Sequence, residues 1–554
     1  MSIVVSHLSY AYRSHTEQAL HDVSAEFRPR EVTLIAGASG CGKTTLIRCI
    51  NGLIPQSYTG GQLSGQIMLF GQDNSKLKLA DISQLVGTVL QGPERQIVAT
   101  EVNGEIAFGL ENLGLAREEI RSRIQHTAAL LHIEPLLGRQ TFLLSDGEKQ
   151  KVALAGVLAM RPRAILLDEP LASLDPESGH ETLSVMRELA DAGIAVVIIE
   201  HRIEDVLDIK PEHCVYMSAG RVIYDGDARG LLDAADWREM KLPAPVIIRK
   251  VRAEKSTTAP VFQPALRGGD SARYTPLIEY QRVGFRYDDG PEVLHDATFA
   301  VRPGDIIAVI GPNGAGKTTL LKHAIGLNRP TRGRVLINQQ DSAKLSVAQI
   351  ARTVGYVFQS PSHMLFAPTV REELSFGPHN IGLDPRTIEA NITYALSAVS
   401  LPDSANLAPL ALSFGQQKRI SIASILTMNP RVLVMDEPTT GQDYASYTHF
   451  MNDIVSRVNA GADRKAGFYE ALIFITHDLD LGITYANRII AVVDGIIVAD
   501  GAPEDILRDQ ALLMRSHVRA TSLLQANTSL LGRGMRFMPA ASLAGMTRVL
   551  DDNA

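Results

Sequence analysis

The sequence predicts an α/β protein made of two copies of one domain, each built on a mainly parallel core sheet. A Gly-x-x-x-x-Gly-Lys-Thr segment occurs twice, at 37–44 and 311–318, each time directly after a short apolar stretch. An apolar stretch that ends in Asp-Glu also occurs twice, at 164–169 and 432–437. The segments recur in the same order and with nearly the same spacing, which indicates a tandem duplication.

Length and composition narrow the class of protein. The 554 residues exceed what one hydrophobic core supports and fit two to four domains. The formal charge of −7 argues against a general nucleic-acid binder, which would normally be basic. Cys41, Cys49 and Cys214 form neither a disulfide framework nor a ligand cluster. No apolar run is long enough to span a bilayer, and the N-terminal residues do not follow a signal-peptide pattern.

The two glycine-rich segments fit the phosphate-binding P-loop, because each follows an apolar strand and opens an amphipathic stretch. Their glycines allow backbone N–H groups to surround phosphate oxygens, the lysine adds a positive charge, and the threonine hydroxyl can bind magnesium. The predicted nucleotide-binding residues are Gly37, Gly40, Gly42, Lys43, Thr44 and Thr45 in the first copy, and Gly311, Gly314, Gly316, Lys317, Thr318 and Thr319 in the second.

The Asp-Glu pairs predict the catalytic carboxylates. Asp168 and Asp436 end the apolar strands, where an acid can hold magnesium directly or through water. Glu169 and Glu437 follow, and a carboxylate one residue further on can polarise an attacking water. A buried strand that runs into a turn would explain the apolar residues, but not an acidic pair in both copies.

Two further segments resemble the signature of ATP-binding-cassette (ABC) ATPases: LLSDGEKQKVALAGVLAMRP at 143–162 and LSFGQQKRISIASILTMNP at 412–430. The resemblance covers residues 1–227 and about 277–505. It implies two P-loop NTPase domains of the ABC type that use ATP and Mg²⁺, each with an antiparallel β region and a helical subdomain. It also implies adenine-stacking aromatics, Q-loop glutamines and switch histidines, which are Tyr12, Tyr287, Gln91, Gln359, His201 and His477.

The resemblance further implies that the two halves pair, with each ATP held by the P-loop of one half and the signature of the other. The Lys43 site would join Lys43, Gln91, Glu169 and His201 with Ser413, Gly415 and Gln416. The Lys317 site would join Lys317, Gln359, Glu437 and His477 with Ser145, Gly147 and Glu148. The magnesium ligands would be Thr44, Gln91 and Asp168 in one site and Thr318, Gln359 and Asp436 in the other.

Both signatures depart from the usual Leu-Ser-Gly-Gly-Gln. The first contains Asp146 and Glu148, whereas the second contains the neutral Phe414 and Gln416. Because a carboxylate near a triphosphate opposes its charge, we expect the Lys317 site to be the weaker one. The alternative is that Asp146 turns away and caps its own helix, which would leave the sites equal.

The expected domains are a first ATPase domain at 1–228, a linker at 229–276, a second ATPase domain at 277–505 and a C-terminal extension at 506–554. Prolines and glycines mark the linker, and the apolar segment PVIIRK within it suggests one short strand. For the extension, a surface helix or a loose terminus is favoured over a docking element.

The stretches 91–112 and 359–380 share the pattern Gln-x-Pro…Thr-x-Val…Glu-x-x-Phe-Gly. They resemble the ATPases of energy-coupling-factor importers for vitamins, their precursors or metal ions. This resemblance implies a transmembrane coupling subunit and a substrate-binding membrane subunit as partners, no nucleic acid, and a location at the cytoplasmic face of the cell membrane. Residues such as Ile97, Val98, Leu365 and Phe366 would line a groove for a partner helix or, alternatively, pack inside their own subdomain.

Two other functions remain open from the sequence. The chain could be the fused ATPase of another importer class, such as one for sugars or peptides. It could also be a soluble ABC-F-type ATPase that binds ribosomes, although those proteins usually have a longer and more basic linker. The transported substrate is chosen by subunits outside this chain.

Overall fold

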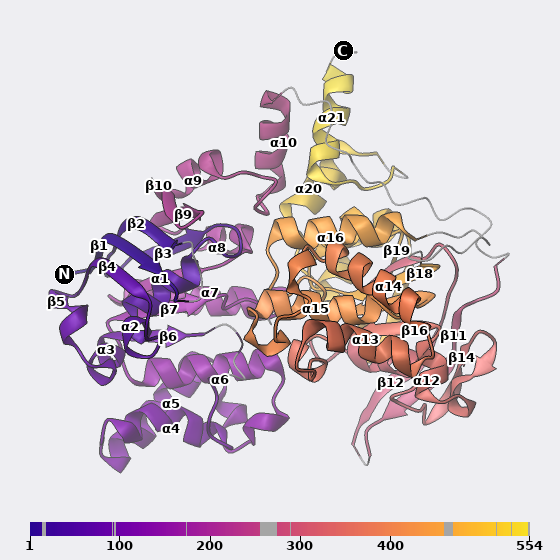
Figure 1. The fold of residues 1–554 in the computed structure, drawn as a ribbon, viewed down its shortest axis with the longest axis horizontal. Helices are drawn as coiled ribbons and strands as arrows, with labels where there is room; N and C mark the ends of the chain where they lie inside the picture. The colour runs from indigo at the N-terminus through magenta and orange to yellow at the C-terminus, as the bar shows by residue number, and fades with distance from the viewer. Residues whose placement is uncertain are drawn as a thin grey trace. The chain divides into compact units, whose positions relative to one another are not determined.

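The computed structural model describes residues 1–13, 18–90, 92, 96–172, 174–254, 274–288, 290–458, 469–516, 518–532 and 535–551. These residues divide into two compact units, Met1–Leu242 and Pro243–Ala554 (Figure 1). Each unit contains a four-stranded antiparallel sheet and a six-stranded, mainly parallel sheet. The predicted fold class, two α/β domains with an added antiparallel region and helices, is therefore confirmed.

In the first unit, the core sheet brings the P-loop, the Asp-Glu pair and the switch histidine to one edge. The sheet order is β10 (Arg221–Gly226), β9 (His213–Ser218), β3 (Val32–Ala36), β8 (Ala195–Ile199), β7 (Ala164–Asp168) and β6 (Val86–Val89), in which only β9 and β10 run antiparallel. Strands β3, β7 and β8 are buried along their whole length, as their continuous apolar sequences predict. Their carboxyl ends lead into the P-loop, the Asp-Glu pair and the switch histidine.

The remaining elements of the first unit surround this sheet. The antiparallel sheet has the order β2 (Gln18–Phe27), β1 (Ile3–Ala11), β4 (Gln62–Leu69) and β5 (Gln72–Asp73). A helical subdomain is formed by α4 (Val102–Asn112), α5 (Arg117–Leu130) and α6 (Asp146–Ala159), which lie together in Figure 1. The other helices are α1 (Lys43–Ile50), α2 (Leu53–Gln56), α3 (Leu79–Leu85), α7 (Pro176–Asp191), α8 (Ile203–Asp208) and α9 (Ala228–Ala234).

The second unit repeats this arrangement. Its antiparallel sheet has the order β12 (Glu292–Val301), β11 (Ile278–Arg286), β14 (Arg332–Ile337) and β15 (Gln340–Asp341). Its core sheet has the order β16 (Val354–Val357), β17 (Val432–Asp436), β18 (Ala471–Ile475), β13 (Ile306–Ile310), β19 (Arg488–Val493) and β20 (Ile496–Gly501). Helices α11 (Lys317–Lys322), α12 (Val347–Ala351), α13 (Val370–Asn380), α14 (Pro385–Ala398), α15 (Phe414–Leu426), α16 (Tyr444–Ser456) and α17 (Leu479–Tyr485) follow in chain order.

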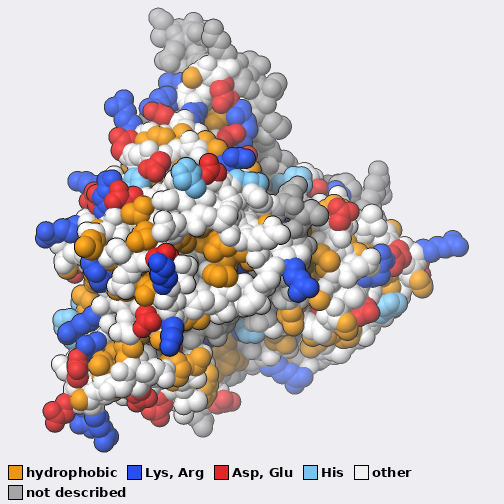
Figure 2. Space-filling view, turned by 60° about the vertical axis from the view of Figure 1, so that its left-hand side comes forward, with side chains coloured by type: hydrophobic (Ala, Val, Ile, Leu, Met, Phe, Trp, Pro, Cys, Tyr) orange, Lys and Arg blue, Asp and Glu red, His pale blue; other side chains and the backbone are white. Residues whose placement is uncertain are grey.

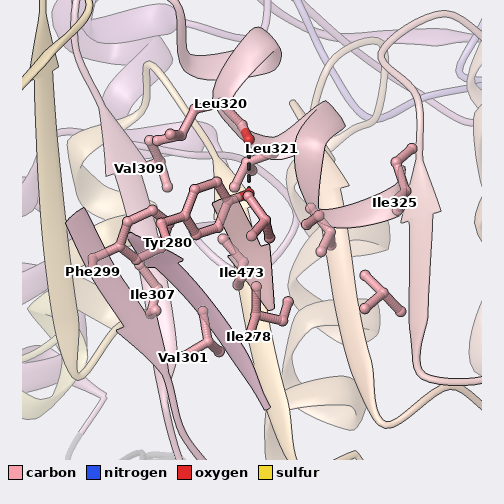
Figure 3. Packing of buried hydrophobic residues seen from close by; sticks show 14 of the residues in the cluster. Ile278, Tyr280, Phe299, Val301, Ile307, Val309, Leu320, Leu321, Ile325 and Ile473 are labelled. Atoms are coloured by element: carbon pink, nitrogen blue, oxygen red, sulfur yellow. Dashed lines mark hydrogen bonds between the residues drawn. The ribbon is translucent and has the colours of Figure 1, made fainter. Parts of the chain in front are cut away.

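One hydrophobic core holds the P-loop helix of the second unit against both sheets (Figure 3). Tyr280 of β11 stacks on Phe299 of β12 with ring centroids 4.3 Å apart. The buried Tyr280 hydroxyl donates a 2.8 Å hydrogen bond to the Leu320 carbonyl of α11. Ile307 and Val309 of β13 belong to the same cluster. The antiparallel sheet therefore fixes the position of the helix that begins at the P-loop lysine.

The segment predicted as a short strand, PVIIRK, is instead part of helix α10 (Ala244–Ala253), so that prediction is wrong. Pro243 occupies the N-cap, and Ala244, Ile247 and Val251 are buried at a helical spacing. This apolar face packs against α20 (Ser522–Leu530) and α21 (Ala540–Asp551) near the C-terminus (Figure 1). Helix α10, which lies within the predicted linker, thus joins the C-terminal helices, which also include α18 (Pro503–Ile506) and α19 (Gln510–Arg515).

A buried ion-pair network is expected to dominate the stability of the second core sheet. The Arg488 guanidinium of β19 donates to Asp305 at 3.0 Å and to Asp500 at 2.6 Å, and the Arg488 and Asp305 side chains are 5% and 0% exposed. Replacing Arg488 by Met leaves the buried Asp305 carboxylate without the guanidinium, so we expect a loss of about 3–5 kcal/mol of unfolding free energy. Urea denaturation followed by circular dichroism measures this loss.

The control is Glu389→Ala, which removes the exposed ion pair between Glu389 and Arg371. Exposed pairs contribute little, so this variant should stay within about 1 kcal/mol of the wild type. Equal denaturation midpoints for Arg488→Met and the wild type would show that the buried network does not stabilise the unit.

Candidate nucleotide-binding sites

Both P-loops have a backbone that glycine alone adopts without strain. Gly42 has a φ of 103° and Gly316 a φ of 90°, and each directly precedes the lysine that opens a helix. A Cβ on Gly42 would lie 2.6 Å from the Ala19 carbonyl oxygen, and one on Gly316 would lie 3.0 Å from the Val293 carbonyl oxygen. The two loops therefore have the conformation that their sequences predict.

The P-loop lysines are buried beside neutral carbonyl groups. The Lys43 ammonium, 6% exposed, donates to the carbonyl oxygens of Gly37 at 2.7 Å and Ala38 at 2.8 Å. Lys317 makes the equivalent bonds to Gly311 and Pro312, both at 2.8 Å. A buried cation at a helix N-terminus, beside backbone N–H groups of a glycine-rich loop, fits an anionic phosphate ligand.

Two of the three predicted magnesium ligands, the threonine and the aspartate, meet in each unit. The Thr318 hydroxyl donates to Asp436 at 2.8 Å, and a hydrogen bond from Thr44 acts in the same way on Asp168. Burial, and next the charge of Glu169, raise the pKa of Asp168 to about 6. Its Oδ1 atom is buried and has no hydrogen-bond partner among the described residues. A buried carboxylate beside a hydroxyl provides the hard oxygen donors that Mg²⁺ prefers, so these residues fit the metal.

The predicted general bases lie beside the predicted switch histidines. The distance from His201 Nε2 to Glu169 Oε1 is 3.2 Å, and the same distance joins His477 Nε2 and Glu437 Oε1. Both glutamates have a positive φ, 53° and 47°, which is strained for a residue with a Cβ. Burial raises the pKa of Glu437 above its usual range, and the positive charge of Lys317 opposes this shift. The same strained acid–imidazole pair thus occurs twice.

The two predicted adenine-stacking tyrosines lie next to the P-loop helices. The hydroxyl groups of Tyr12 and Tyr287 each lie 3.1 Å from the hydroxyl of the second P-loop threonine, Thr45 or Thr319. Tyr287 remains 47% exposed, so much of its surface is free to contact a ligand. This location agrees with the predicted role at the edge of the nucleotide site.

The signature serines begin the helices that follow them. Ser145 is the N-cap of α6 and forms a capping box with Glu148, whose carboxylate accepts the Ser145 backbone N–H at 2.8 Å. Arg139 also donates to Glu148 at 3.2 Å. Ser413 and Gln416 form the same box at α15, with the backbone N–H bond at 3.0 Å. Glu148 and Gln416 therefore have the same local function despite their different charge.

Two residues singled out by the sequence are not fully described. Gln91 lies outside the described residues, and nothing is described of the Asp146 side chain. In the second unit, the carbonyl oxygen of Gln359 accepts a 2.7 Å hydrogen bond from Lys418. The Q-loop assignment can therefore be examined only in the second unit.

Sequence reasoning missed Lys418, a fully buried lysine in the second signature helix. Its ammonium donates to the carbonyl oxygens of Phe358, Gln359 and Asp436, and burial lowers its pKa to about 8. It connects the signature helix, the Q-loop and the strand that carries the metal ligand. The signal in the sequence was the lysine in SFGQQKR, where the first copy has Gln150.

The duplicated stretches after the Q-loop glutamines form the same structure in both units. The buried carboxylate of Glu105 accepts the backbone N–H groups of Val98 and Ala99 at 2.9 and 2.8 Å, and Glu373 accepts those of Phe366 and Ala367 at 2.8 Å. The repeated glycines allow close packing, because a Cβ on Gly109 or Gly377 would lie within 2.7 or 2.8 Å of the sulfur of Met160 or Met428. The shared pattern thus preserves a loop fixed to a helix.

Each of these loops presents apolar side chains to the surface. Val98 and Phe108 are 62% and 50% exposed in the first unit. Phe366 and Phe376 are 62% and 52% exposed in the second, with ring centroids 4.8 Å apart. Leu365 is buried, so this residue packs inside its own unit rather than lining a groove. The exposed pairs form what we call the loop patches, defined as Val98 with Phe108 and Phe366 with Phe376.

Two further features of the described chain bear on function. Acidic and basic side chains are interspersed over the surface seen in Figure 2. Within the described ranges, no helix is both long enough and apolar enough to cross a bilayer.

Comparison with known proteins agrees with the geometry. A family model described as ABC transporter matches residues 20–172 and 294–440. A Methanosarcina mazei protein assigned as an ABC transporter ATP-binding protein is 33% identical and aligns over 90% of this chain and 88% of its own. A Streptococcus pneumoniae protein with the same assignment is 35% identical over 93% of both chains. CbiO1 of Clostridium perfringens, described as part of the ABC transporter complex CbiONQ, is 27% identical and covers 44% of this chain and 95% of its own, with a TM-score of 0.38.

Proposed function

Because the chain belongs to the ATP-binding proteins of ABC transporters, and is therefore an ATPase with two ABC domains, we propose that it drives a membrane importer of the energy-coupling-factor type. Its partners are a transmembrane coupling subunit and a substrate-binding membrane subunit, and it works at the cytoplasmic face of the membrane. The substrate is a vitamin, a vitamin precursor or a metal ion.

One observation carries this proposal: the duplicated stretch that ends in the loop patches. A soluble protein seldom exposes paired aromatic rings in a contiguous patch without a partner. The Glu373 carboxylate holds the backbone of Phe366, whose ring packs edge-on against Phe376 of the same helix as Glu373, so the apolar surface is preorganised for a helix that lies across it. In the first unit, Glu105 makes the same hydrogen bonds to Val98 and Ala99, and Val98 and Phe108 are exposed, so each half presents apolar side chains in this stretch.

Hydrolysis follows from the residues at each P-loop. The lysine ammonium and the N–H groups at the helix start bind the phosphates, and the tyrosine stacks on adenine. The threonine and aspartate would hold Mg²⁺, which would supply neutralisation of the phosphate charge. The glutamate accepts a proton from the attacking water, and the neighbouring imidazole hydrogen-bonds the γ-phosphate. Each half contributes its signature to the ATP of the other, which gives two composite sites.

The importer proposal is tested by crosslinking from the loop patches. A photoreactive amino acid replaces Val98 or Phe366, and the variant is crosslinked in intact membranes. Mass spectrometry then identifies the proteins that are crosslinked to it. We expect adducts with an integral membrane subunit from both positions, because both apolar side chains are more than half exposed. The control positions are Ile223 and Ile496, which are 55% and 48% exposed but lie on β10 and β20, away from the patches.

Adducts restricted to ribosomal proteins would favour the ABC-F alternative and contradict the importer proposal. Equal adducts from the patch and control positions would show that exposure alone, rather than a specific surface, determines crosslinking.

A further inference from the structure

A buried carboxylate joins two segments of the first unit. Glu200 is 3% exposed and follows β8 directly. Its Oε1 atom accepts the backbone N–H groups of His201 at 2.7 Å and Arg202 at 3.1 Å. Its Oε2 atom accepts the N–H of Leu171 at 3.1 Å, in the turn that follows Glu169. One side chain therefore ties the switch histidine segment to the turn after the general base.

The Arg202 side chain forms a second connection between the same segments. Its guanidinium donates to the carbonyl oxygens of Leu171 at 3.2 Å and Leu174 at 3.1 Å. A 2.6 Å bond to Asp205 on α8 fixes the guanidinium from the other side. Glu200 accepts a backbone N–H of the turn after Glu169, and Arg202 donates to two carbonyl oxygens of the same turn. Together these bonds restrict the turn more than either side chain would alone.

Among the described residues of the second unit, no equivalent clamp is present. Thr476 stands in the position of Glu200, and its hydroxyl accepts the backbone N–H of Asp478 at 2.9 Å, within its own segment. The turn after Glu437 is closed on itself, because Gln442 donates to the Pro438 carbonyl at 2.5 Å. The same histidine and glutamate are therefore supported by different contacts in the two units.

We propose that Glu200 and Arg202 are positioning residues for hydrolysis at the Lys43 site. They fix the His201 segment to the turn after Glu169, so the imidazole and the carboxylate keep their 3.2 Å alignment through the catalytic cycle. This inference rests on the roles proposed above for Glu169 and His201. Neither positioning residue needs to contact ATP, because both act through the backbone of neighbouring residues.

The chemistry of the clamp explains why a carboxylate is required. Three backbone N–H groups converge on Glu200, and a carboxylate has enough lone pairs to accept all of them. Thr has one hydroxyl oxygen on a shorter side chain, so it cannot join both segments. Gln retains one acceptor oxygen for the His201 and Arg202 N–H groups but presents an amide donor to the Leu171 N–H.

The test compares Glu200→Thr, Glu200→Gln and Arg202→Met in the full-length chain by steady-state ATP hydrolysis. All variants are measured in the Glu437→Gln background, which leaves turnover to the Lys43 site. There we expect Glu200→Thr to lower kcat about fivefold while the KM for ATP stays within about twofold, since alignment rather than binding is lost. Glu200→Gln should give an intermediate kcat, and Arg202→Met should lower kcat about threefold. Thr476→Ala is the matched control in the second unit, and its kcat should stay within about twofold of the Glu437→Gln parent.

A kcat equal to that of the Glu437→Gln parent in both Glu200→Thr and Arg202→Met would overturn the inference, and so would a KM that rises in parallel with the loss of kcat. If Glu200→Thr fails to fold, Arg202→Met decides, because the Arg202 side chain is 30% exposed and its removal leaves the backbone hydrogen bonds to Glu200 in place. Glu169→Gln is measured alongside. Full turnover in Glu169→Gln contradicts the proposed site itself, whereas a loss there with none in the clamp variants contradicts only the positioning role.

Discussion

Replacing Lys43 and Lys317 together by alanine is expected to abolish ATP hydrolysis, to below about 1% of the wild-type rate. Both lysines are 6% exposed and open a helix, and their ammonium groups donate to loop carbonyls. Alanine removes the positive charge that would face the phosphates and leaves those carbonyl oxygens without their donor. The loss therefore affects nucleotide binding as well as turnover.

Phosphate release measured with saturating ATP and magnesium tests this prediction, and binding of a fluorescent ATP analogue separates affinity from catalysis. The single variants Lys43→Ala and Lys317→Ala show how much each site contributes. Lys76→Ala is the control, since this lysine side chain is 80% exposed and lies outside both P-loops. Hydrolysis that persists in the double variant would refute the assignment of both sites.

The second prediction concerns unequal sites: Glu169→Gln should remove the larger share of turnover and Glu437→Gln the smaller. In the proposed pairing, the Lys317 site receives the acidic signature, whereas the Lys43 site receives Phe414 and Gln416. A carboxylate within several ångströms of the γ-phosphate opposes its charge by on the order of 1 kcal/mol. That changes occupancy several-fold without abolishing binding.

The capping geometry indicates that most of the difference in ATP affinity between the two sites comes from Asp146. Glu148 is held in the capping box and paired with Arg139, which offsets its charge. We therefore expect Asp146→Gly to raise the ATP affinity of the Lys317 site several-fold, and Glu148→Gln to have a smaller effect. Both are measured by ATP titration in the Lys43→Ala background. Equal losses in the two glutamate variants, together with unchanged affinity in Asp146→Gly, would show that the signature acids have no energetic effect.

The sequence alone determined the fold class, and it predicted most residues of the two candidate sites. The P-loops, the Asp-Glu pairs and the signature serines are short segments whose chemistry depends on neighbours in the chain. Each P-loop needs a glycine at positive φ followed by Lys-Thr, and the sequence pattern alone indicates this. Duplication strengthened every one of these assignments, because the same residues recur in the same order.

The tertiary structure decided what depends on partners far away in the chain. The segment PVIIRK has no local feature that separates a strand from a helix. In the folded chain it forms a helix whose apolar face is buried against α20 and α21, which come near the end of the sequence. Glu200 and Lys418 look like ordinary charged residues in the sequence. Their roles emerge only when folding buries them and brings backbone groups from separate loops within hydrogen-bond distance, because a buried charge must find partners wherever the fold supplies them.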